Sequence, residues 1–189
     1  MSPPSKAVSV TATGDADGWQ IVPGFFVQRE DSGASRLLVA VPTRFLAAVH
    51  RDLVRALGDR TSVLYRQKIE RANPRQEGAP PRDFLALDVP VDRVLEALAD
   101  AHDLFYADAR AELWLRGIRG QQIILDCDGL VYVYPDDPLF KDVCRANGLS
   151  EGIVPTMSER DYVKHVFDAA NDPHEIQFLT MLGLTEMPR

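Results

Sequence analysis

The chain has 189 residues, a length typical of one domain or of two small ones, and its 46% hydrophobic and 26% charged content is typical of a globular protein. Its formal net charge of -7 argues against general nucleic-acid binding, because phosphate contacts need a basic surface. No apolar run approaches the roughly 20 residues that a membrane helix needs. We therefore expect a soluble protein that binds neither nucleic acid nor membranes and whose charge suits, at most, a basic protein partner.

Two cysteines, Cys127 and Cys144, are too few for a disulfide framework. They cannot form a structural zinc site without the four histidines, and no pair of histidines has the i, i+4 spacing of a helical metal site. Reduced thiols are typical of the cytoplasm. Arginine outnumbers lysine 17 to 4, a skew that indicates a GC-rich bacterial genome. We expect a cytoplasmic bacterial protein.

The first part of the chain has the pattern of short strands separated by turns. Residues 1–7 are expected to form a disordered tail. Alternating or apolar runs follow, divided by clusters of Gly, Asp and Ser. Their regular spacing predicts an antiparallel meander with strands at 8–13, 19–22, 25–28 and 36–41.

A helix and a half-exposed strand are predicted next. Apolar residues recur every four positions over 45–57, and Thr43 and Gly58 stand where helix caps belong. Residues 61–69 then alternate between an apolar face and a mostly charged one, which predicts a strand with one face in water. The segment 73–82 contains three prolines and is the clear internal loop.

The second half repeats the order of strand and helix and ends in helices. Asp137, Ser158 and Asp172 stand at expected helix starts. The expected elements are a strand at 84–88, a helix at 91–101, strands at 112–116, 121–126 and 130–134, and helices at 138–147, from Ser158, and from Asp172 to Gly183.

Together these patterns predict an α+β fold. The N-terminal meander and the second group of strands form a mostly antiparallel sheet that is covered by helices, and the C-terminus is helical. Residues 8–189 form a single domain or, alternatively, two halves joined by the loop at 73–82.

One string has the pattern of a catalytic motif: in Ile123-Ile-Leu-Asp-Cys-Asp-Gly-Leu130, an apolar strand precedes Asp-x-Asp-Gly. It resembles the first motif of the haloacid dehalogenase-like phosphatases. The resemblance implies that Asp126 is a nucleophile and Asp128 a general acid and base, with magnesium neutralising charge. Further positions that this reading would use are Thr156, Lys164, Asp168 and Asp172.

The same string is also a hairpin signal, because Asp-Gly between two apolar runs is typical of a tight turn. The phosphatase fold needs alternating strands and helices after its motif, whereas the residues after Gly129 read almost wholly as helix. We therefore expect 121–134 to form a two-stranded ladder and assign no catalytic residue, with Asp126 and Asp128 as the only candidates. Cys127, in the same turn, has no neighbouring base in the sequence that would activate it.

No Gly-x-Ser-x-Gly string and no glycine-rich phosphate loop occurs anywhere in the chain. The hypothesis is therefore a non-catalytic protein-binding domain: an adaptor, an immunity-type protein or a secretion-chaperone-like protein, whose order of elements is similar to that at 90–147. One alternative is an enzyme whose site is assembled from distant residues, with the magnesium-dependent phosphatase using Asp126 and Asp128 as the named case. Another is a small-ligand sensor or structural subunit. A protein partner is expected and no cofactor is implied; the metal content and oligomeric state stay open.

Overall fold

The computed structural model describes residues 5–29, 33–69 and 80–188. In chain order its elements are β1 (Ala7–Ser9), β2 (Gly24–Arg29), β3 (Ser35–Ala40), α1 (Thr43–Arg55), β4 (Arg60–Gln67), β5 (Arg82–Pro90), α2 (Val91–Asp100), α3 (His102–Tyr106), β6 (Ala111–Gly117), β7 (Gln122–Leu125), β8 (Val131–Tyr134), α4 (Pro138–Ala146), a 3-10 turn η1 (Met157–Glu159), β9 (Val163–His165), a second 3-10 turn η2 (Ala169–Asn171), α5 (Asp172–Leu182) and β10 (Thr185–Glu186).

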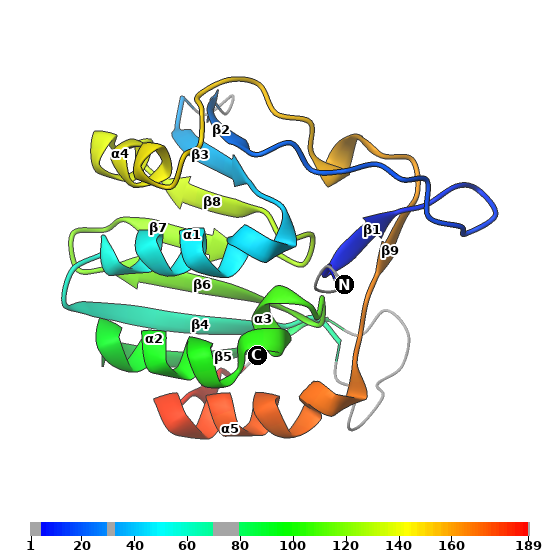
Figure 1. The fold of residues 1–189 in the computed structure, drawn as a ribbon. Coiled ribbons are helices and arrows are strands. Elements are labelled where there is room, and N and C mark those ends of the chain that lie inside the picture. Colours follow the sequence, from blue (N-terminus) through cyan, green and yellow to red (C-terminus); the bar gives the residue numbers. More distant parts are fainter. Residues whose placement is uncertain (1–4, 30–32, 70–79, 189) are drawn as a thin grey trace.

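The predicted α+β class with a mostly antiparallel sheet is confirmed. One eight-stranded sheet has the order β10-β5-β4-β6-β7-β8-β3-β2, all pairs antiparallel, and β1 pairs with β9 in a separate two-stranded sheet. Figure 1 shows the helices in front of one face of the large sheet. The molecule is therefore a two-layer arrangement in which a single helical layer covers one sheet face.

Strand β4 shows how sequence alternation decides which side chains enter the core. Val63 and Tyr65 are fully buried on the helical side, whereas Leu64 and Arg66 are only partly buried on the other. Successive side chains of a strand point to opposite faces, so a single register sets both faces at once. The predicted strand with one wetter face is confirmed.

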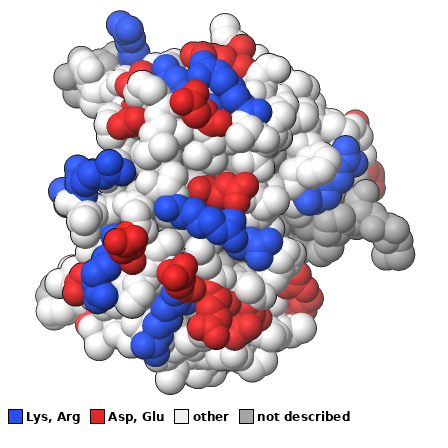
Figure 2. Space-filling model, turned by 60° about the vertical axis from the view of Figure 1, so that its left-hand side comes forward, with Lys and Arg blue, Asp and Glu red and all other residues white. Residues whose placement is uncertain are grey.

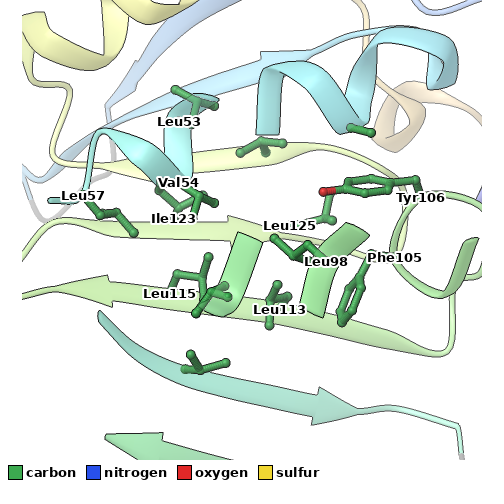
Figure 3. Packing of buried hydrophobic residues seen from close by; sticks show 14 of the residues in the cluster. Leu53, Val54, Leu57, Leu98, Phe105, Tyr106, Leu113, Leu115, Ile123 and Leu125 are labelled. Carbon is green, nitrogen blue, oxygen red and sulfur yellow. The ribbon is translucent and has the colours of Figure 1, made fainter. Parts of the chain in front are cut away.

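The core lies between the large sheet and the helical layer. Figure 3 shows Leu113, Leu115, Ile123 and Leu125 of the sheet pointing toward apolar side chains of the helices. Helix α1 contributes its buried stripe because apolar residues recur at helical spacing. Strands on either side of the segment 70–79, β4 and β5, are neighbours in the same sheet. The described residues from both halves of the chain thus share one core.

The N-terminal part departs from the expected meander. Strand β1 does not pair with β2, and β2–β3 is a hairpin whose second strand borders β8. Residues 19–22 contain no strand. Lys6 and Ala7, which were expected in a disordered tail, are each 1% exposed, so these two residues belong to the folded domain; residues 1–4 lie outside the described residues. The long-range partner β9 decides this, and no local pattern at the N-terminus reveals it.

The helix predicted from Ser158 is wrong. The cap there starts only the 3-10 turn η1, with Thr156 at its N-terminus and Glu159 completing the capping box. Strand β9 follows and pairs with β1, with His165 opposite Ala7. A capping signal indicates where a helix can begin. The helix is stable only if an apolar stripe follows that packs against the core. That stripe is missing here, so strand pairing is favoured instead.

The last helix, α5, is confirmed from Asp172 to Leu182, and Gly183 ends it at φ 65°. Phe178 and Leu182 on this helix are buried, whereas the apolar Ile176 is 64% exposed. Glu175 takes an inward position because buried hydrogen-bond donors lie opposite it.

The predicted loop at 73–82 lies outside the described residues, except for its last three positions, where Arg82 begins β5. Across the described residues, no helix is long and apolar enough to cross a membrane. Figure 2 shows acidic and basic side chains lying close together over the face that it presents.

Candidate functional site

The turn between β7 and β8 is built by the Asp126 side chain. The amide of Asp126 donates to the Leu130 carbonyl at 3.0 Å, and Asp126 Oδ1 accepts from the amides of Asp128 (2.9 Å) and Leu130 (2.8 Å). Gly129 has φ +83°, a value that a β-branched residue resists. The expected two-stranded ladder over 121–134 is confirmed. The turn holds Cys127 and Asp128 at its tip by hydrogen bonds that are independent of their own side chains.

Two residues that are distant in the sequence face this turn. His165 of β9 donates from Nε2 to Asp128 Oδ1 at 2.7 Å, and Lys68, just after β4, lies with Nζ 3.6 Å from Cys127 Sγ. One ligand atom each from Cys127, Asp128 and His165 lies within 4.8 Å of the other two, and all three residues are partly buried. We call Cys127, Asp128, His165 and Lys68 the turn cluster.

The absence of a base beside Cys127, inferred from the sequence, is corrected by this geometry. His165 is 38 positions away and was assigned to a helix, where its side chain would have had a different neighbourhood. Pairing of β9 with β1 carries it to the turn. The only signal for this in the sequence is the valine and aromatic content of 162–167, a run too short to identify a strand by itself.

Hydrogen bonds and charge favour the protonated forms of the two bases in the turn cluster. The hydrogen bond to Asp128, followed by the one to Cys127, raises the pKa of His165 to about 10. Burial alone would lower the pKa of Lys68, but its hydrogen bond to Glu112 and the neighbouring Cys127 thiol raise it above the usual value. At neutral pH both are therefore cations next to a thiol and a carboxylate.

A second lysine, in the N-terminal segment, binds the main chain of the turn. Lys6 is buried and donates from Nζ to the main-chain oxygen of Asp126 at 2.7 Å. Burial lowers the pKa of Lys6, while the Asp126 charge opposes that shift. Burial, and then the Asp128 charge, raise the pKa of Asp126 to about 6. The N-terminal segment thus fastens the main chain of the turn.

The other positions that the phosphatase resemblance would use are engaged elsewhere. Thr156 begins η1, and Asp168 caps η2 by accepting from the Ala170 amide. Asp172 accepts a hydrogen bond from Arg110 at 2.7 Å. Lys164 is exposed on β9, opposite Val8. None of these four is described in contact with the Asp126 carboxylate. No catalytic residue was assigned from the sequence, and Asp126 and Asp128 were candidates only under the phosphatase alternative.

A second buried ionic group surrounds Arg110, in the connection between α3 and β6. Its side chain is fully buried. One of the carboxylates that pair with Arg110 belongs to Glu175. Glu175 also accepts hydrogen bonds from Tyr65 Oη at 2.6 Å and Gln67 Nε2 at 2.8 Å, so it joins α5 to β4. Because the charges in this group are paired and hydrogen-bonded, we interpret it as a structural network that attaches the C-terminal helix α5 to the rest of the domain. The guanidinium donates to the carboxylates of Asp108, Asp172 and Glu175 and to the main-chain oxygen of Asp168.

The sheet face opposite the helices has an apolar row that crosses seven strands in register. We call this row the apolar stripe. Its members are direct cross-strand neighbours: Leu85, Leu64, Trp114, Ile124, Tyr132, Leu38 and Phe26.

The two ends of the apolar stripe differ in how far other residues cover them. At the β3 end, Leu38 packs with Leu130 and Val154 in a small second cluster. At the β5 end, Leu85, Leu64 and Trp114 are only partly buried. We call these three residues the open end of the stripe.

The aromatic ring at the open end is held in place by a paired cation. The guanidinium of Arg66 lies 5.1 Å from the Trp114 ring centroid and makes two 2.9 Å hydrogen bonds with the carboxylate of Asp83. Cation–π stacking and a bidentate ion pair together restrict both side chains. The open end is therefore a pre-ordered surface with an aromatic side chain and an arginine.

Comparison of the chain with known protein families, with curated proteins and with solved structures finds no match.

Proposed function

We propose that this chain is a non-catalytic protein-binding domain that docks a partner protein against the open end of the stripe. One observation carries the proposal: the helices lie on one face of the large sheet, while Leu85, Leu64 and Trp114 lie side by side and partly exposed on the other. Monomeric proteins rarely leave contiguous apolar surface uncovered without a use for it.

The chemistry of the open end fits a protein partner. Aromatic and arginine side chains are enriched at protein–protein interfaces, and Trp114 under Arg66 combines the two in one ordered unit. Leu64 and Leu85 extend the apolar surface on neighbouring strands, and Leu87 on β5 is 69% exposed. An adaptor, a chaperone-like protein and an immunity-type protein all need such a surface. We further propose a bacterial cytoplasmic setting, which the free thiols and the arginine-rich composition support.

The proposal is tested by affinity capture from the native host with three versions of the full chain: the wild type, Leu64→Glu and Ile176→Glu. Leu64 belongs to the open end, whereas Ile176 is 64% exposed on α5 in the helical layer and serves as the matched control. We expect one stoichiometric protein to be captured by the wild type and by Ile176→Glu. Its yield should fall by more than about tenfold with Leu64→Glu, because a buried charge costs several kcal/mol at an interface.

The captured protein is then produced separately and titrated against the same three versions, which removes indirect capture. Equal binding by all three would place the interface elsewhere and contradict the proposal. So would light scattering that shows a homodimer dissociated by Leu64→Glu, because the surface would then serve a second copy of this chain. Circular dichroism of each variant shows that a loss of binding is not a loss of fold.

A further inference from the structure

The turn cluster brings together a thiol, a carboxylate and an imidazole, which is a donor set that binds transition-metal ions. Their ligand atoms lie within 4.8 Å of one another. A tetrahedral zinc ion, with bonds of about 2.0–2.3 Å, places its ligand atoms roughly 3.3–3.8 Å apart. Small rotations of the three side chains bring them onto one ion, which then takes the place of the proton between His165 Nε2 and Asp128 Oδ1, and that proton is released to solvent.

We propose that Cys127, Asp128 and His165 form a binding site for a single divalent ion of the zinc class, with the fourth coordination position open to water or to a ligand. A mixed sulfur, nitrogen and oxygen set favours zinc over magnesium or calcium, which take oxygen ligands almost exclusively. Three protein ligands and one open position are the arrangement of accessible zinc sites rather than of closed structural ones.

The main chain that presents the ligands is fixed in advance. Asp126 Oδ1 holds the amides on both sides of the turn, and Lys6 holds the Asp126 carbonyl. On the opposite side, the Val166 amide donates to the Lys6 carbonyl at 2.8 Å, which secures the strand that carries His165. The same buried residue, Lys6, thus connects both ligand-bearing segments. Such pre-organisation lowers the entropic cost of metal binding.

Lys68 completes the site from outside the ligand set. Its ammonium lies 3.6 Å from Cys127 Sγ and 2.9 Å from Glu112 Oε1. A neighbouring cation stabilises the thiolate, which is the form of cysteine that binds a metal. Because Glu112 balances the lysine charge, the pair adds a hydrogen-bond donor to the sulfur without adding net charge to the site. Hydrogen bonds of this kind orient and tune metal ligands.

The test uses Co²⁺ as a spectroscopic replacement for zinc on the reduced full chain at neutral pH. We expect one equivalent to bind, with visible bands of a tetrahedral ion and a near-ultraviolet thiolate-to-cobalt charge-transfer band, both removed by Zn²⁺. Cys127→Ser should abolish the charge-transfer band. His165→Gln should weaken Co²⁺ binding by more than about tenfold, because even the loss of residues that only orient metal ligands costs that much.

The matched controls are Cys144→Ala and His102→Gln, which remove the other thiol and an exposed histidine. Both should retain the wild-type spectrum and affinity. A charge-transfer band that survives in Cys127→Ser, or disappears in Cys144→Ala while the fold is intact, would overturn the proposal. So would the absence of any saturable Co²⁺ or Zn²⁺ binding by the wild type in isothermal titration. Lys68→Met removes the cation next to Cys127 but none of the three proposed ligands. We therefore expect Co²⁺ to bind this variant with its charge-transfer band but with lower affinity.

Discussion

On strand β6, Leu113 and Leu115 point into the helical layer, and Trp114 between them points to the opposite face. The seven residues of β6, Ala111–Gly117, therefore contribute to two surfaces with different chemistry. On the covered face the side chains of Leu113 and Leu115 are almost fully excluded from water. On the open face an indole ring stays partly exposed beneath a guanidinium. The difference shows that a strand can serve the core and a docking surface at once, provided that helices cover only one side.

The dependence of the covered face on α5 is the strongest test of this comparison. Removing residues 172–189 would expose the surface under Phe178 and Leu182 and take two carboxylates from the buried Arg110. Each large apolar side chain contributes roughly 1.5–3 kcal/mol, and a buried ion pair that loses one partner costs about 3–5 kcal/mol. We expect the truncated chain to lose its cooperative thermal transition, measured by circular dichroism. A melting temperature equal to that of the full chain would show that α5 does not stabilise the sheet.

A matched pair of leucine substitutions compares the two faces directly. Leu115→Ala empties a fully buried position and should lower the free energy of unfolding by about 2–5 kcal/mol. Leu64→Ala removes the same atoms from the open end, where water already reaches the side chain, and should cost less than about 1.5 kcal/mol. Urea denaturation measures both. Similar losses for the two variants would mean that the open face is as well covered as the core.

The covered face also contains a histidine that must stay neutral. His50 of α1 is buried, with Nδ1 3.0 Å from Tyr106 Oη, and Nε2 has no partner among the described residues. Burial, followed by the charges of Lys6 and Arg51, lowers its pKa to about 3.

Between pH values of about 6.5 and 3 the unfolded chain therefore holds a proton on this residue that the folded chain does not hold. The free energy of unfolding should fall as the pH is lowered through that window, by up to about 1.4 kcal/mol per pH unit from this group. His50→Asn keeps a partner for Tyr106 and removes the titration. Denaturant melts of both proteins at pH 7, 6 and 5 should show a shallower pH dependence for the variant. Parallel curves would mean that His50 is charged in the folded protein.

The smallest effect is expected for Ile176→Ala. This residue is apolar, but its side chain is 64% exposed on α5. Substitution should change the free energy of unfolding by no more than about 0.5 kcal/mol, as at other surface positions. A loss above 1.5 kcal/mol, measured by the same urea titration, would indicate that this side of the helix is covered after all.

Local patterns determined most of the secondary structure. The four-residue recurrence in α1, the alternation in β4, the cap at Asp137 and the Asp-Gly turn after Asp126 each identified an element correctly, because each depends on neighbours within a few positions. The same patterns separated the two faces of the sheet before any contact was known, since strand periodicity alone assigns side chains to one face or the other.

Only the tertiary structure decided how distant segments meet. Ala7 and His165 pair across more than 150 positions, and Lys6 reaches Asp126 across 120. Strand pairing is a long-range choice among many alternatives that differ little in local propensity, so three residues of β9 could not be told from a helix after a good cap. The turn cluster exists because of that pairing. The sequence by itself therefore identified the turn that holds Cys127 and Asp128, whereas the histidine and the lysine that give the turn its chemistry came from the packing of the whole chain.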